Sequence, residues 1–166
     1  MKVHHLERAI GVHPRMLVLL SAWQQRGPFE IVVAMHGGLR TDERVQKMLS
    51  GGGMSAAGSL RKTPHGRGGA LDLWPRTFLP YVPSSWGGTA KRWGTWPQLP
   101  ALVKAQFAEI VAFSKGLGFR CGADWISHDY PNGDNPHHEL PDWGRLPFPP
   151  PEYEWPSDLA AVCASS

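Results

Sequence analysis

Two separate segments of this 166-residue chain carry residue types that bind a transition metal. His65 and Asp72 stand at the two ends of the sequence HGRGGALD, and His137 lies within DNPHHE. A catalytic zinc ion usually takes three protein ligands, chosen from imidazole, carboxylate and thiolate, and keeps a fourth position for water. One histidine and one aspartate from the first segment, with one histidine from the second, would form such an open site. We therefore predict that His65, Asp72 and His137 bind Zn²⁺.

The first segment has the pattern of a short strand with one polar face. Side chains alternate across a strand, so Leu71 and Leu73 would face the core while Asp72 faces a cleft. Ala70 lies on the same face as Asp72 and is small enough to leave room beside a metal. The glycines at 66, 68 and 69 allow the backbone to approach a ligand closely.

The second segment has the same alternation. His137 and Glu139 share one face, and His138 points away from it. Pro136 stiffens the entry to this strand. We interpret Glu139 as a residue that supports the site or the strand, and not as a ligand.

Hydrolysis at such a site needs a proton acceptor and a cationic group. A carboxylate takes the proton of the attacking water and returns it to the leaving amine. Asp134, three residues before His137, is our candidate, and Asp129 is the alternative. The attacked carbonyl oxygen becomes an anion, and Arg40 is our candidate for binding it.

These segments resemble the D-Ala-D-Ala carboxypeptidase and L-alanyl-D-glutamate endopeptidase family of zinc peptidases. HGRGGALD fits its pattern His-x-x-Gly-x-Ala-x-Asp, and DNPHHE fits the Asp-x-Pro-His-x-Glu of its phage endolysin branch. HGGLRT is similar to the family's Gly-x-Arg segment, and GADW to a Gly-Gly-Asp-Trp segment before the last ligand. The resemblance runs from about residue 35 to 143, in the family's order.

The resemblance implies a zinc peptidase that cleaves the peptidoglycan stem peptide. It assigns zinc to His65, Asp72 and His137, proton transfer to Asp134, and substrate or oxyanion binding to Arg40. Substrate contacts are further expected from Thr63, His36 and Trp125. Thr63 stands where the family often has serine, and the connection between GADW and DNPHHE is longer than in the family. The Trp-rich loop at 78–99 matches no family segment.

The elements that must position these residues follow from the pattern of apolar residues, Gly and Pro. We expect helices at 13–25, 42–49 and 100–115, strands at 29–35, 69–74, 119–125 and 137–143, and loops at 51–68 and 75–99. This is an α+β fold, a small antiparallel sheet with packed helices, resembling the zinc D-Ala-D-Ala peptidase fold. Residues 1–143 would form the catalytic domain, and 144–166 a Pro-rich tail packed on it.

Composition limits the other possibilities. Hydrophobic residues make up 42% of the chain and charged residues 19%, as in ordinary globular proteins. Two cysteines without a CxxC pattern argue against a disulfide framework and a thiolate metal site. The net charge of +3 comes without a dense Lys/Arg run, so we expect no nucleic-acid partner. No apolar stretch is long enough for a signal peptide or a membrane span.

The preferred bond, by resemblance to the endolysin branch, is L-Ala to D-Glu. Two alternatives stay open: a D,D-carboxypeptidase that trims terminal D-Ala, and a zinc-stabilised cell-wall-binding module without catalysis. A third, a nucleic-acid-binding domain, rests only on the basic pI of about 9.1. We expect a monomer that stays in the host cytoplasm until a holin, by family analogy, releases it to the periplasm and cell wall.

Overall fold

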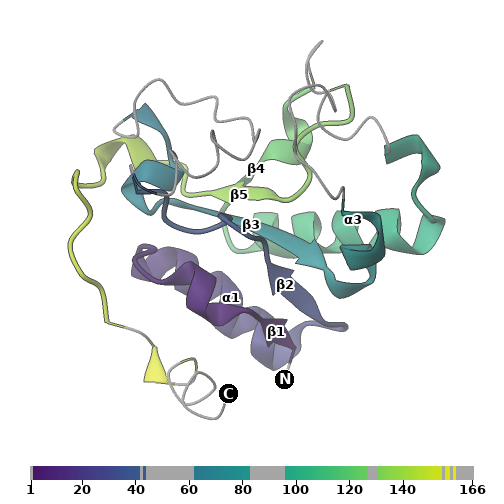
Figure 1. Ribbon diagram of the computed structural model, residues 1–166, viewed down its shortest axis with the longest axis horizontal. Coiled ribbons are helices and arrows are strands. Elements are labelled where there is room, and N and C mark those ends of the chain that lie inside the picture. The colour runs from purple at the N-terminus through teal and green to yellow at the C-terminus, as the bar shows by residue number, and fades with distance from the viewer. Residues whose placement is uncertain are drawn as a thin grey trace.

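The computed structural model describes residues 2–41, 43, 62–82, 96–126, 131–154, 156, 157 and 159. Within them, helices α1 (Pro14–Arg26) and α3 (Ala101–Gly116) pack on a five-stranded sheet (Figure 1). The α+β class expected from the sequence is confirmed.

The sheet has the spatial order β1-β2-β3-β5-β4. Its strands are β1 (Val3–His4), β2 (Ile31–Val33), β3 (Ala70–Pro75), β4 (Arg120–Cys121) and β5 (His137–Glu139). The pairings β2–β3, β3–β5 and β5–β4 are antiparallel, but β1 pairs with β2 in parallel. The expectation of an antiparallel sheet is therefore wrong at one edge. Strand β1 has only two residues, which is too short to show an alternating pattern.

Three of the four predicted strands were too long. The first covers only 31–33 of the predicted 29–35. Strand β4 ends at Cys121 because Gly122–Asp124 form a 3₁₀ turn, η6. Strand β5 ends at Glu139, two residues before Pro141, which has no N–H to donate to a ladder. The prediction of 69–74 for the central strand agrees with β3 to within one residue.

The two helices begin where the sequence predicts. Pro14 takes the first position of α1, and the His13 ring accepts a hydrogen bond from the Arg15 N–H at 3.2 Å. Pro100 precedes α3, and both predicted helices agree with the structure to within one residue. The predicted helix at 42–49 lies outside the described residues, apart from Glu43.

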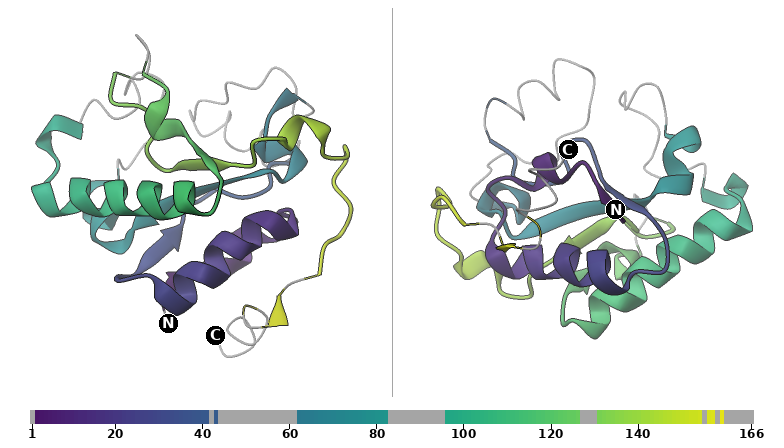
Figure 2. Two further views of the ribbon diagram at one scale, coloured as in Figure 1. Left: turned by 180° about the vertical axis from the view of Figure 1, so that it is seen from behind. Right: turned by 90° about the horizontal axis from the view of Figure 1, so that it is seen from below.

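The core lies on one face of the sheet, between the sheet and the two helices. Leu71 and Leu73 of β3 are fully buried there, and so is Ile110 of α3. The ring centroids of Trp23 on α1 and Phe113 on α3 are 4.9 Å apart, so both helices cover the leucine face (Figure 2). The opposite face of β3 and β5 is left for Asp72 and His137.

A second, smaller apolar cluster joins the end of β3 to the first half of α3. The rings of Phe78 and Phe107 are 5.2 Å apart, and Trp96 packs on Phe107 at 5.5 Å. Phe78 lies in a 3₁₀ helix, η4 (Arg76–Tyr81), and Trp96 begins another, η5 (Trp96–Gln98). The loop predicted at 75–99 is therefore structured at both ends, and its Trp86 and Trp93 lie outside the described residues.

The Pro-rich tail contacts the rest of the chain at several points. Leu159 is fully buried in the main core, and the Tyr153 ring lies edge-on to His13 at 5.0 Å. The division into a catalytic domain and a tail that begins at residue 144 stays a prediction. Cys121 is a free, buried thiol, and Cys163 lies outside the described residues.

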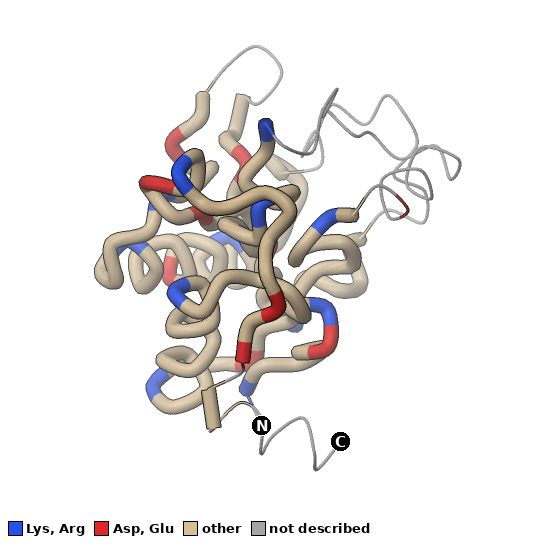
Figure 3. The backbone as a smooth tube through the Cα atoms, turned by 90° about the vertical axis from the view of Figure 1, so that its left-hand side faces the viewer, with Lys and Arg blue, Asp and Glu red and all other residues tan. Residues whose placement is uncertain are grey.

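The described part of the chain also shows how charged residues are distributed and whether a helix could span a membrane. Acidic and basic residues are interspersed along the backbone, without a continuous basic stripe on the side that Figure 3 shows. Among the described helices, none is long and apolar enough to cross a membrane.

Candidate metal centre

Pairing of β3 with β5 brings the two sequence segments together. In this antiparallel pair Asp72 lies opposite His137, and Ala70 lies opposite Glu139. The leucines of β3 face the core, so these four residues share the other face, as the alternation predicted. Two segments more than sixty residues apart therefore place a carboxylate and an imidazole next to each other.

His65 reaches this face from a short 3₁₀ turn, η3 (His65–Arg67), that precedes β3. The Thr63 hydroxyl accepts the Gly66 N–H at 3.0 Å and fixes the start of the turn. Gly68 then adopts a left-handed backbone with φ of 69°. A Cβ there would lie only 2.7 Å from the Gly11 carbonyl oxygen, so this position requires glycine.

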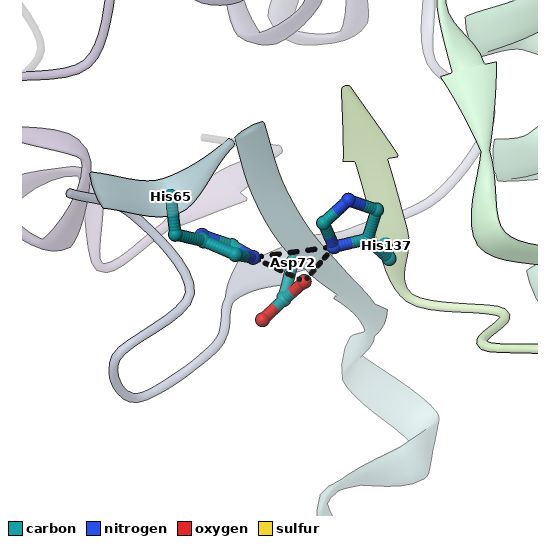
Figure 4. Close-up of side chains that lie close together, drawn as sticks. All are labelled: His65, Asp72 and His137. Carbon is teal, nitrogen blue, oxygen red and sulfur yellow. Dashed lines mark hydrogen bonds and ion pairs between the residues drawn. The ribbon is translucent and has the colours of Figure 1, made fainter. Parts of the chain in front are cut away.

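The three predicted ligands converge (Figure 4). His65 Nε2 lies 3.2 Å from Asp72 Oδ1 and 3.2 Å from His137 Nδ1, and His137 Nδ1 lies 3.2 Å from Asp72 Oδ1. Two zinc bonds of about 2.0–2.1 Å at a tetrahedral angle place their donor atoms about 3.3–3.4 Å apart. The three atoms thus form a triangle that matches one face of a zinc tetrahedron, and the residues fit the metal.

The site opens toward solvent on one side. The side chains of His65 and His137 are 4% and 7% exposed, whereas Asp72 is 16% and Arg40 is 21% exposed. The two histidines are therefore more deeply buried than the carboxylate and the guanidinium. A metal ion held by His65, Asp72 and His137 would thus have three protein ligands, the number that a catalytic zinc site takes from the protein.

Burial and charge together set the protonation of the three groups. Burial acts to lower the pKa of His137, but hydrogen bonds to Asp72 and Glu139 outweigh it and raise the pKa to about 9. Burial lowers the pKa of His65, and the opposing effect of Asp72 does not restore it. Burial also disfavours the Asp72 carboxylate, but its interactions with His65, His137 and Arg40 hold the pKa of Asp72 well below its usual range. The site therefore keeps an ionised carboxylate at neutral pH, ready to bind a cation.

Arg40 lies at the edge of the triangle. Its guanidinium donates to Asp72 Oδ2 at 3.1 Å and to the His36 carbonyl at 3.1 Å. His36 itself has a left-handed backbone with φ of 63°, which turns the chain after β2 toward the site. The structure thus places Arg40 beside Asp72 and the His36 carbonyl beside Arg40, while the predicted roles of Arg40 and His36 toward substrate stay predictions.

Asp134 lies one turn before His137. Its carbonyl accepts the His137 N–H at 3.0 Å, and its own N–H donates to the Gly122 carbonyl at 2.7 Å. A Cβ on Gly122 would lie 2.5 Å from the Asp134 carbonyl oxygen, so this close approach requires glycine. The negative charge of Asp134 contributes to the raised pKa of His137. The proton-transfer role stays a prediction, and the alternative, Asp129, lies outside the described residues.

Two other predicted substrate residues lie near the ligands. The Trp125 ring is 4.8 Å from the His137 ring and tilted by 44°, so it packs against this candidate ligand. The Thr63 hydroxyl accepts the hydrogen bond that holds the turn carrying His65.

His138 lies on the opposite face of the sheet, as the alternation predicted. It is fully buried there, and its Nδ1 lies 3.5 Å from Cys121 Sγ.

Sequence reasoning missed two parts of the site. The Gly38 carbonyl lies 2.9 Å from His65 Nδ1 and directs Nε2 toward the metal position. A backbone contact of this kind leaves no trace in side-chain patterns. The ion pair of Arg40 with Asp72 was also not predicted, because the sequence analysis assigned Arg40 to the carbonyl oxygen under attack and not to a ligand.

Comparisons with known proteins give little beyond a general likeness. No protein-family model and no curated protein matches the chain. Among solved structures, the chain is similar to the L-Ala D-Glu endopeptidase ChiX of Serratia marcescens, at 19% sequence identity and a TM-score of 0.47. That superposition covers 84% of this chain and 88% of the other.

Proposed function

We propose that this chain is a zinc peptidase that hydrolyses an amide bond of the peptidoglycan stem peptide, between L-Ala and D-Glu. The observation that carries the proposal is the triangle of His65 Nε2, Asp72 Oδ1 and His137 Nδ1, with every edge 3.2 Å long. The choice of substrate rests on the resemblance of the surrounding motifs to wall-cleaving zinc peptidases.

In this proposal each residue has a separate task. His65, Asp72 and His137 hold the zinc ion, which when bound polarises a carbonyl and lowers the pKa of a water. Asp134 accepts the proton of the attacking water and returns it to the departing amine nitrogen. Arg40 stabilises the negative charge that develops on the carbonyl oxygen. A guanidinium has five N–H donors, so its bonds to Asp72 and His36 do not exhaust it.

The decisive experiment is digestion of purified muropeptides with the zinc-loaded protein, followed by mass spectrometry. Products with a new N-terminal D-Glu are expected. Free D-Ala would instead identify a D,D-carboxypeptidase, and intact muropeptides would refute the peptidase proposal.

The variant Asp134→Asn tests the catalytic role separately from metal binding. We expect it to bind zinc as the wild type does, and to lose cell-wall clearing by at least about a hundredfold, because general acid–base catalysis contributes that much. His65→Ala is the matched control and should lose both zinc and clearing. Unchanged clearing in Asp134→Asn would contradict the proton-transfer role of Asp134, whereas a wild type that binds zinc and cell walls without clearing them would favour a non-catalytic zinc-stabilised module.

A further inference from the structure

Each of the three metal-binding side chains has an outer partner. The Gly38 carbonyl lies 2.9 Å from His65 Nδ1, and Arg40 donates to Asp72 Oδ2 at 3.1 Å. For His137 the partner is Glu139, whose Oε2 lies 3.1 Å from His137 Nε2. The first two contacts involve a backbone group and a partly exposed cation. The third joins two buried side chains.

Glu139 is an unusual residue to find at this depth. Its side chain is only 3% exposed, and a buried carboxylate is costly unless it is paired. Its Oε1 lies 3.4 Å from the guanidinium of Arg120, its neighbour across the β4–β5 pair. Its Oε2 is bonded to His137. Both oxygens are thus engaged, and the group is held in one orientation.

The sheet register creates the space for this contact. Ala70 lies opposite Glu139 on β3, on the face that carries the metal ligands. Ala70 is fully buried, and its small side chain leaves the carboxylate room to turn back along β5 toward His137. The two residues are i and i+2 on one strand, so their side chains emerge on the same side.

The geometry points to Glu139 as a positioning residue that fixes which nitrogen of His137 binds the metal. A neutral imidazole has one N–H and one lone pair. Because Glu139 is a carboxylate acceptor, it holds the proton on Nε2 and leaves the lone pair on Nδ1, the atom in the triangle. His65 is fixed in the opposite sense, since its Nδ1 faces the Gly38 carbonyl and its Nε2 faces the metal position.

This inference rests on the metal site of the proposed function and is independent of the substrate. It therefore has readouts that need no peptidase activity. Zinc affinity is measured by competition with a chromophoric chelator. The protonated nitrogen of each histidine is identified in the zinc-bound protein by long-range ¹H–¹⁵N spectra.

In the wild type we expect zinc on Nδ1 and the proton on Nε2 for His137, with the reverse for His65. Glu139→Ala should weaken zinc binding about 10- to 100-fold, the usual effect of removing an outer partner of a ligand. It should also expose the Nε2 proton of His137 to faster exchange. Glu139→Gln keeps an acceptor oxygen of the same size and should recover part of the affinity.

Arg120→Ala is the matched control, because it removes the contact to the other oxygen of the same carboxylate. Arg120 is 55% exposed, so the loss should be less than about fivefold. Zinc bound through Nε2 of His137, or wild-type affinity and spectra in Glu139→Ala, would overturn the inference. If Glu139→Ala fails to fold, Glu139→Gln decides by the same measurements. A protein that binds zinc as expected but leaves muropeptides intact would refute only the peptidase.

Discussion

The two faces of strand β3 differ in what holds their side chains in place. On one face, Leu71 and Leu73 are held by close packing against both helices. On the other, Asp72 is held by directed contacts to His65, His137 and Arg40. The packed face tolerates any apolar group of suitable volume, whereas the polar face depends on individual atoms. Alternation along one strand therefore places a core that tolerates apolar substitutions next to a site that depends on the position of individual atoms.

The difference teaches how a small domain can hold a polar cluster at low exposure. Burying Asp72, His65 and His137 costs free energy, which their hydrogen bonds to one another and to Arg40, Gly38 and Glu139 offset. The leucine face supplies the stability that keeps the strands paired, and pairing sets the register Asp72 to His137. Substitutions on the two faces should therefore change different measurable quantities.

The largest effect on stability is expected from the packed face. Leu73 is fully buried, so Leu73→Ala should lower the free energy of unfolding by about 2–5 kcal/mol. Zinc affinity of the folded fraction should change little, since the Leu73 side chain lies in the apolar core, on the face of β3 opposite Asp72. Chemical denaturation of the metal-free protein measures the first quantity and chelator competition the second.

The matched control for this change is Leu79→Ala. Leu79 is 41% exposed, and its truncation should cost less than about 0.5 kcal/mol. If Leu73→Ala weakened zinc binding tenfold without changing stability, the separation of the two faces would be wrong.

The alternation of residues 70–74 could be predicted from the sequence because it depends only on strand geometry, and the ligand set follows from residue chemistry and motif order. Strand ends were predicted less well, since the 3₁₀ turn at Gly122 and the missing N–H of Pro141 stop pairing where the apolar pattern continues. The contact of His65 with the Gly38 carbonyl depends on how two loops meet, which no local pattern specifies.

The next largest effect is expected on the polar face of β3, where pH should change the affinity for zinc. The pKa of His137 in the metal-free protein is raised to about 9, so its ring is protonated at pH 7. Zinc needs the neutral ring, and binding must therefore release about one proton. His65 has a lowered pKa and should release none at this pH. Affinity should then rise about tenfold per pH unit between about pH 7 and 8.5, and level off above 9.

Titration calorimetry in two buffers of different ionisation enthalpy counts the released protons. Release close to zero at pH 7.5 would contradict the assigned protonation of His137.

The raised pKa of His137 also affects the stability of the metal-free protein. Because the pKa of His137 is about 9 in the folded protein and 6.5 in the unfolded chain, protonation of His137 stabilises the folded state. This contribution to the free energy of unfolding is complete below pH 6.5. It is lost as the pH rises through 9.

The smallest effect on stability is expected from a substitution of Thr63, on the polar side of the comparison. Its hydroxyl holds the turn that carries His65, so Thr63→Ala should cost about 1 kcal/mol of stability. Thr63→Ser keeps the hydroxyl and should behave as the wild type in thermal unfolding. The family resemblance predicts instead that this hydroxyl contacts substrate. That role would raise the KM of Thr63→Ala and leave its thermal unfolding unchanged, because a substrate contact contributes nothing to the free protein. Thermal unfolding and KM measured on both variants therefore decide whether Thr63 supports the site from outside or forms part of the cleft.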